Sequence, residues 1–302
     1  MPKLHAQPFL FVPLLLVLLK MQSVAMVPSE CQDVWRIDLH ANARCRVDEQ
    51  HFGKLKYYRW QNNRWQLSDA ETFFDTQQAV VPVSFFALGF TLTTSEVTQT
   101  GFDIVRNFAP NKPCRVVFLD WYSERTDDTY RRDIRKRLPI TDNTGDYTAL
   151  LLQKLKPQSK ACLFGFSLGN RIVCGAAETL RKNGRRPEGL RLHLVISGSA
   201  TDACEFAEGQ RYSEVPQAAE KIMVTYNPSD TALRFYHAIY GCLNKTAALG
   251  LKGLPIRSID SEYQYQFENI NIERYVGSKH QTLSHVQSPP FRSRINTYFF
   301  FE

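Results

Sequence analysis

The sequence predicts an α/β fold with a mainly parallel central sheet, helices on both faces and antiparallel N-terminal strands. From residue 79 onward, five apolar runs alternate with segments of helical pattern, and such alternation is typical of parallel sheets with right-handed crossovers. The runs are nearly continuous, as expected for strands covered on both faces. The strands expected before residue 70 alternate polar and apolar side chains instead, which favours an antiparallel start to the sheet.

The first expected strands cover residues 34–39 and 55–60, and Asn62-Asn63 turns the chain toward Trp65. Later strands are predicted at 79–88, 114–121, 161–166, 190–197 and 221–226, with a final strand over 270–276. Helices are predicted at about 93–107, 129–137, 145–156, 168–183 and 229–242.

The composition is that of a globular chain. The 302 residues are 43% hydrophobic and 22% charged, without the bias typical of disorder. No repeat, low-complexity tract or long linker divides the sequence, so we expect a single domain over residues 26–302. The net charge of +7 favours a surface tuned for solubility, with peripheral contact to an anionic membrane as an alternative and no nucleic-acid partner.

Residues 1–25 have the pattern of a signal peptide. Lys3 precedes an apolar run over residues 9–19, and small residues follow at Ser23-Val24-Ala25. The run is shorter than the roughly 20 residues that a spanning helix needs. We therefore expect a secreted, periplasmic or cell-envelope protein, with an uncleaved N-terminal anchor as the alternative. Cleavage would remove Lys3 and Lys20 and no acid, so the net charge would be 7 − 2 = +5.

The seven cysteines do not define a metal site. An oxidising compartment permits disulfides, but an odd number leaves at least one thiol unpaired. No spacing typical of a zinc site is present, so we expect no metal and no cofactor. Cys162 and Cys174 are expected to be buried; no pairing is predicted among the others, which are Cys31, Cys45, Cys114, Cys204 and Cys242.

Ser167 is the candidate nucleophile. It lies in Gly165-Phe166-Ser167-Leu168-Gly169, after an apolar strand and at the start of a predicted helix. A tight strand-to-helix turn exposes a serine hydroxyl above the sheet, and small flanking residues leave room for the strained backbone. The Leu168 N–H follows the nucleophile and is the first expected oxyanion donor. A serine that only caps the helix is the simpler alternative.

The acid and the base should follow the serine in chain order. Asp230 comes directly after the strand at 221–226, although it could serve only as a helix cap, and Asp202 is the alternative acid. His280 follows the expected last strand in a Gly-Ser loop, with His285 as its rival. His193 alternates within a strand and is expected to be packed.

The second oxyanion donor is expected in the loop after the strand at 79–88. Gly89 permits a close turn there, and the N–H of Phe90 or of Thr91 is the candidate, with Phe90 preferred.

Residues 79–300 resemble the α/β-hydrolase superfamily of esterases and lipases, especially an uncharacterised bacterial branch. The resemblance rests on Leu88-Gly89-Phe90, Asp120-Trp121-Tyr122-Ser123-Glu124, the segment from Gly165 to Val173, Tyr226 to Leu233, and Gly277-Ser278-Lys279-His280. It implies a triad of Ser167, Asp230 and His280 and favours His280 over His285. Relatives commonly have His-Gly at Leu88-Gly89, and this departure concerns the oxyanion loop.

We therefore expect a serine hydrolase that cleaves carboxylic esters through an acyl-enzyme, acting on a small-molecule or lipid ester. The alternatives are a non-catalytic envelope binding protein on the same fold and a lipase acting at membranes. A lipase would need an apolar lid, for which Trp121, Tyr122 and residues 243–265 are the candidates. The basic stretch 131–137 is expected to be a solvated helix face, and the aromatic tail 298–301 is expected to pack on the core.

Overall fold

The computed structural model of the chain describes residues 33–41, 45, 47–108, 113–127, 129–236 and 247–302. The expected signal peptide, Cys31, Cys242, residues 243–246 of the lid candidate and most of the second half of the helix expected over 229–242 lie outside the described residues.

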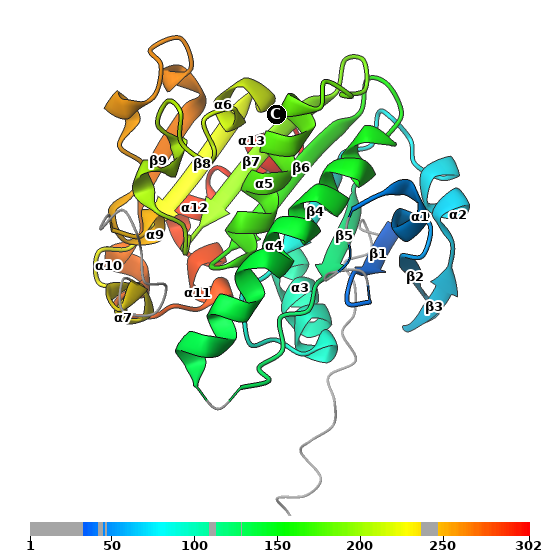
Figure 1. Cartoon of the computed structure of the whole chain (residues 1–302), viewed down its shortest axis with the longest axis horizontal. Helices are drawn as coiled ribbons and strands as arrows, with labels where there is room; N and C mark the ends of the chain where they lie inside the picture. The colour runs from blue at the N-terminus through cyan, green and yellow to red at the C-terminus, as the bar shows by residue number, and fades with distance from the viewer. Residues whose placement is uncertain (1–32, 42–44, 46, 109–112, 128, 237–246) are drawn as a thin grey trace, which may run out of the picture.

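A nine-stranded sheet forms the centre of the protein, with the strand order β3-β2-β1-β5-β4-β6-β7-β8-β9 (Figure 1). Seven strands form parallel pairs: β1 (Asp33–Asp38), β5 (Arg115–Asp120), β4 (Val83–Ala87), β6 (Lys160–Phe166), β7 (Arg191–Ser197), β8 (Lys221–Tyr226) and β9 (Phe267–Asn271). Strands β2 (Lys56–Gln61) and β3 (Arg64–Ser68) add antiparallel pairs at one edge.

A two-residue turn at Asn62-Asn63 joins the antiparallel strands β2 and β3. Asn62 and Asn63 have φ of 53° and 57°, the left-handed conformation that asparagine tolerates and that two-residue hairpin turns require. The predicted α/β fold, with a mostly parallel sheet and antiparallel N-terminal strands, is confirmed, and the topology is consistent with that of α/β-hydrolases.

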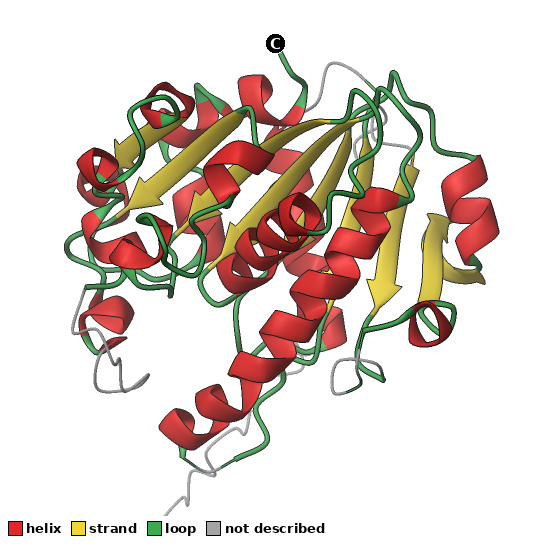
Figure 2. Ribbon diagram, turned by 45° about the horizontal axis from the view of Figure 1, so that its top comes forward, coloured by secondary structure: helices red, strands yellow, loops and turns green. Residues whose placement is uncertain are grey.

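Helices cover both faces of the sheet (Figures 1 and 2). Long helices α4 (Tyr130–Gln153) and α5 (Gly169–Lys182) lie on one face, while α3 (Thr94–Phe108), α11 (Thr282–Val286), α12 (Pro289–Arg292) and α13 (Ile295–Phe299) pack on the other. Consecutive strand side chains enter opposite cores, as Phe85 and Phe86 do. The short helices are α1 (Glu49–Phe52), α2 (Ala70–Asp75), α6 (Val215–Ala218), α7 (Thr231–Arg234), α9 (Leu249–Lys252) and α10 (Glu273–Val276), with the 3-10 turns Ala203–Phe206, Ile256–Ser258 and Gln264–Gln266.

The prediction of two separate helices over 129–137 and 145–156 is wrong, because the single helix α4 continues through Pro139. The hydroxyls of Thr141 and Thr144 donate to helix carbonyls at 2.7 Å each. Gly145 allows close packing on α5, since a Cβ there would lie 3.1 Å from the Ile172 carbonyl oxygen. Packing of α4 against α5 therefore outweighs the local free-energy cost of Pro139 within α4.

The expected final strand over 270–276 is also misplaced. Strand β9 ends at Asn271, whose side-chain oxygen accepts the N–H of Glu273 at 2.9 Å. This turn starts helix α10, so the apolar residues Ile272 and Val276 are buried from a helical turn rather than from a strand.

Several packing predictions are confirmed. Cys162 and Cys174 are fully buried, and burial raises the pKa of both thiols. His193 is buried and stacks on Phe301 with ring centroids 3.9 Å apart. Residues 298–300 of the aromatic tail are buried. Within the described part of the chain, no helix combines the length and the apolar character needed to cross a membrane.

Candidate active site

Ser167 occupies a sharp turn between β6 and α5. Its φ is 52°, a strained conformation for a residue with a side chain. The turn lies at the carboxyl end of a central parallel strand, where ligands of open α/β sheets bind. The N-terminus of the 14-residue helix α5 follows, and its dipole favours negative charge beside Ser167.

Two glycines allow this turn to form. A Cβ at Gly169 would lie 2.0 Å from the carbonyl oxygen of Ala87, because the helix start packs directly against β4. A Cβ at Gly165 would lie 2.4 Å from the Asn170 side-chain oxygen. Neither position has room for a larger residue, as the strand-turn-helix motif predicts.

Asn170 fixes the turn from within the helix. Its side-chain amide donates to the carbonyl oxygens of Ser167 at 3.0 Å and Ser197 at 2.9 Å. The Ser197 carbonyl also accepts the N–H of Ser167 at 3.1 Å. The end of β7 and the start of α5 thus hold the backbone of Ser167 on both sides. No role was expected for Asn170 from the sequence, although this residue lies within the segment from Gly165 to Val173.

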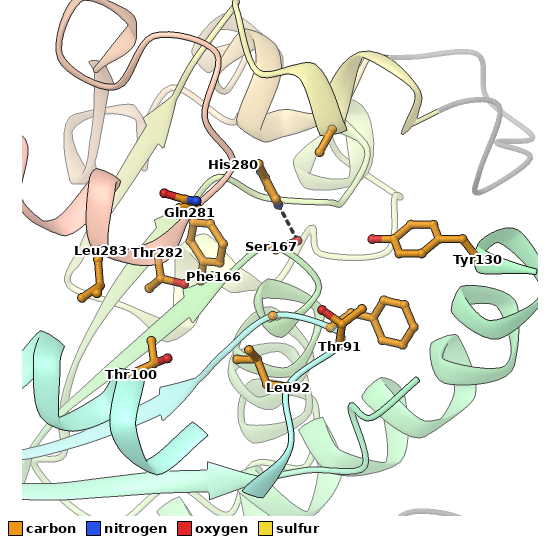
Figure 3. Close-up of a pocket in the computed structure, with 13 residues that line it drawn as sticks. Thr91, Leu92, Thr100, Tyr130, Phe166, Ser167, His280, Gln281, Thr282 and Leu283 are labelled. Carbon is orange, nitrogen blue, oxygen red and sulfur yellow. Dashed lines mark hydrogen bonds between the residues drawn. The ribbon is translucent and has the colours of Figure 1, made fainter. Parts of the chain in front are cut away.

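Ser167, His280 and Asp230 form a chain of hydrogen bonds (Figure 3). The Ser167 hydroxyl lies 2.8 Å from His280 Nε2, and His280 Nδ1 lies 2.7 Å from Asp230 Oδ2. Asp230 is fully buried. The structure brings the three predicted side chains together from sequence positions 63 and 50 residues apart. This arrangement can take a proton from the serine and hold the resulting imidazolium.

The alternative acid and base have other contacts. Asp202 begins the 3-10 turn Ala203–Phe206, and its N–H donates to Glu205 at 3.1 Å. His285 is fully buried and contacts the hydroxyl of Ser197 at 3.1 Å rather than that of Ser167. The structure therefore pairs Ser167 with His280 and His280 with Asp230.

The loop after β4 approaches the serine closely. A Cβ at Gly89 would lie 3.2 Å from the Cβ of Ser167. The Thr91 N–H is already bound to the carbonyl oxygen of Ser123 at 2.9 Å. Among the described residues, the N–H groups of Phe90 and Leu168 have no hydrogen-bond acceptor. Phe90 and Leu168 are therefore the candidate oxyanion donors, and Thr91 is not.

The segment 121–123 supports this loop. Trp121 is fully buried, and its indole N–H donates to the Leu88 carbonyl oxygen at 2.9 Å. The hydroxyl of Ser123 donates to the Leu92 carbonyl oxygen at 2.7 Å. Trp121 is thus a support for the oxyanion loop, and the idea that it belongs to a lid is wrong. Leu88 contributes its backbone carbonyl here, so this contact does not depend on the side chain at that position.

A cavity of about 610 Å³ opens beside Ser167, a size suited to a small organic molecule. Figure 3 shows Tyr130 on one side of Ser167 and Leu92, Thr100, Thr282 and Leu283 on the other. Tyr130 comes from the start of α4, which no sequence signal connected with the site. The described residues that line the cavity are Gly89, Phe90, Thr91, Leu92, Thr100, Tyr130, Phe166, Ser167, Ala232, His280, Gln281, Thr282 and Leu283.

Among the described residues that line the cavity, His280 is the only one with a basic side chain, and none has a carboxylate. Across the described residues, no group of three or more His, Cys, Asp and Glu side chains is placed to hold a metal ion. The described residues place a serine, a histidine and backbone amides at the cavity.

Comparisons with known proteins add no relative: no protein-family model matches the chain, and no curated protein matches it. The fold and the geometry of the site therefore carry the functional argument.

Proposed function

We propose that this protein is a serine hydrolase of the α/β-hydrolase superfamily that cleaves carboxylic esters. The observation that carries the proposal is the continuous hydrogen-bond chain from Ser167 through His280 to buried Asp230. It occurs at the carboxyl end of a parallel sheet, with a strained backbone at the serine and free N–H groups nearby. These are the parts that acyl transfer through a serine requires.

In the proposed reaction, His280 Nε2 accepts the proton of Ser167 as the serine oxygen attacks the ester carbonyl. Asp230 holds the imidazole through Nδ1 and stabilises its positive charge. The N–H groups of Leu168 and Phe90 stabilise the oxyanion. His280 then returns the proton to the departing alcohol, and water hydrolyses the acyl-enzyme by the same steps in reverse.

The cavity favours an uncharged substrate. Aliphatic and aromatic side chains make up six of the thirteen described lining residues, and threonine is the commonest polar residue among them. An ester with an uncharged acyl group fits this lining, whereas a charged acyl group would lose its hydration without an ion-pair partner among the described lining residues. On the pattern of residues 1–25 we also propose export, so the esters would be encountered outside the cytoplasm.

The test is covalent labelling of the purified protein with a fluorophosphonate, which reacts with activated serines. The wild type is expected to take up one probe per chain, and hydrolysis of p-nitrophenyl esters of increasing acyl length follows. Ser167→Ala should abolish labelling, and His280→Ala should slow it by roughly a thousandfold or more.

Matched controls use a serine and a histidine away from the cavity. Ser258→Ala and His51→Ala remove the same groups from the turn at 256–258 and from α1, and both should label like the wild type. A folded wild type that takes up no probe would contradict the proposal and favour the alternative of a non-catalytic binding protein.

A further inference from the structure

His285 is a buried histidine that the proposed reaction does not use. It lies on α11, is fully buried, and places Nδ1 3.1 Å from the hydroxyl of Ser197. Ser197 ends β7 and pairs in register with Phe166 on one side and Thr225 on the other. The contact therefore joins α11 to the strand end beside the nucleophile.

The direction of the hydrogen bonds follows from counting protons. The Thr225 hydroxyl donates to the Ser197 oxygen at 2.8 Å. The contact with Thr225 does not use the single hydroxyl proton of Ser197, which is therefore available to His285 Nδ1, and we assign the hydrogen bond in this direction. The imidazole is then neutral and carries its own proton on Nε2. Nε2 has no hydrogen bond of normal geometry among the described residues, and the Lys279 carbonyl supplies a favourable electrostatic contact.

The groups that face His285 keep it neutral. Burial first, and then the neighbouring His280, lower the pKa of His285 to about 3. The Asp230 carboxylate and the Lys279 carbonyl act in the opposite direction but do not reverse the shift. At neutral pH the ring is therefore uncharged, and in the Nε2–H tautomer its Nδ1 is an acceptor for Ser197.

The surroundings are shaped around this ring. Gly198 has φ of 49°, and a Cβ there would lie 2.9 Å from His285 Cε1. The Phe166 ring contacts both histidines, with centroids 5.0 Å from His280 and 5.2 Å from His285. One aromatic side chain thus contacts both the proposed base and the second histidine.

The backbone of Ser167, the cavity wall on α11 and the loop with His280 all adjoin the contact between Ser197 and His285. The backbone carbonyl of Ser197 holds the N–H of Ser167, while its side chain holds His285. Helix α11 contributes Thr282 and Leu283 to the cavity wall, and it begins two residues after His280. A displacement of α11 from β7 would therefore change the distance between His280 and Ser167.

We propose that His285 is a positioning residue that accepts a hydrogen bond from the Ser197 hydroxyl and so fixes α11 and the His280 loop against the strand end that holds Ser167. This inference rests on the proposed hydrolase function. It assigns no chemical step to His285, since the Ser167 hydroxyl is bound to His280 and His285 is not among the described residues that line the cavity.

The test compares His285→Asn with His285→Leu, which have nearly the same size. Asparagine keeps an acceptor near the position of Nδ1, whereas leucine leaves the Ser197 hydroxyl without a buried partner. Turnover is divided by the number of active sites that react with the phosphonate, which gives kcat per active site. We expect this kcat to fall roughly tenfold in the leucine variant and to stay close to the wild-type value in the asparagine variant. Ser197→Ala should slow turnover similarly, and the double variant with His285→Leu should be no slower than either.

A purely structural role would lower the unfolding temperature without changing kcat for each titrated site or the pH profile of kcat/KM. That result would overturn the proposal, as would equal rates in the two His285 variants.

A second measurement needs no turnover and so separates this inference from the proposed function. By NMR of the imidazole nitrogens, His285 should remain the neutral Nε2–H tautomer from pH 5 to pH 8. The His280 signals should shift or broaden in His285→Leu and not in His285→Asn. Unchanged His280 signals in both variants would overturn the positioning role even if the wild type hydrolyses esters. If the NMR result holds but the wild type takes up no phosphonate, only the hydrolase function fails.

Discussion

Asp230 orients His280 with one carboxylate oxygen while its other oxygen begins a helix. Oδ2 lies 2.7 Å from His280 Nδ1, and Oδ1 accepts the N–H of Leu233 at 2.9 Å. The helix cap and the proposed catalytic contact, which the sequence offered as alternatives, are thus made by the same buried side chain. Because two bonds fix the carboxylate, its orientation toward His280 is set before a substrate binds.

The two roles can be separated by substitution. In Asp230→Asn an amide oxygen can still cap α7, but the amide nitrogen faces His280 Nδ1 and favours the wrong tautomer. We expect phosphonate labelling to slow by roughly ten-thousandfold with little loss of stability. Asp230→Ala should be equally inactive and also lose about 1 kcal/mol of folding stability with the cap. Labelling rates and thermal unfolding measure the two effects.

Asp69 provides the matched control for these variants, because it caps α2 by accepting the Thr72 N–H at 2.7 Å. Asp69→Ala should reduce stability without changing the labelling rate. Wild-type labelling by Asp230→Asn would contradict the assignment of Asp230 as the orienting acid.

The strain at Ser167 predicts a gain in stability when its side chain is removed. With φ at 52°, glycine fits the turn better than alanine, so Ser167→Gly should be more stable than Ser167→Ala by about 1 kcal/mol. For a domain of this size the unfolding temperature should differ by roughly 2–4 °C. Ser258 lies in a 3-10 turn without positive φ, and its glycine variant should be the less stable one. The same order at both positions would contradict the argument.

The fold could be predicted from the sequence because the pattern of the parallel strands is local. Runs such as 114–121 and 190–197 are apolar on both faces, and each corresponds to an observed strand. The continuity of α4 through Pro139 was not predictable from local pattern, since it depends on packing against α5. The end of β9 at Asn271 depends on a single side-chain bond, which periodicity does not report.

The candidate site was predictable only as a set of candidates. The Gly-rich turn around Ser167 has a local signature, and the structure has the expected backbone there. His280 and His285 are five residues apart, and only their spatial contacts separate the one that meets Ser167 from the one that meets Ser197. Tyr130 reaches the cavity because α4 extends past the sheet, which its own sequence does not indicate.

The cavity beside Ser167 predicts a limit on acyl length. Leu283 lines the end of the cavity that also contains Leu92 and Thr100 (Figure 3). Leu283→Trp should fill this end, so kcat/KM for an octanoyl ester should fall roughly tenfold while that for an acetyl ester changes little. The control is the same substitution on β3, Leu67→Trp, where the leucine is 72% exposed; it should leave kcat/KM for both esters unchanged. An equal loss for both esters would show that Leu283 does not contact the acyl chain.

His193 predicts a loss of stability in mild acid. It is 1% exposed, and burial lowers its pKa to about 4 from 6.5, with Lys221 and Arg191 acting in the same direction. The carbonyl of Tyr298 and the carboxylate of Glu220 oppose this shift without cancelling it.

Because the unfolded chain takes up a proton at this histidine near pH 6.5 and the folded chain only near pH 4, folding stability falls as the pH decreases through that interval. Between pH 7 and pH 5 the titration of His193 should lower the free energy of unfolding by up to about 2 kcal/mol. Replacement by phenylalanine keeps the stacking on Phe301 and removes the titration. Denaturant unfolding at pH 7 and pH 5 should therefore show a smaller drop for His193→Phe than for the wild type. Equal drops would mean that the native protein admits the proton, and that the packing of the C-terminal aromatic residues on this strand opens in mild acid.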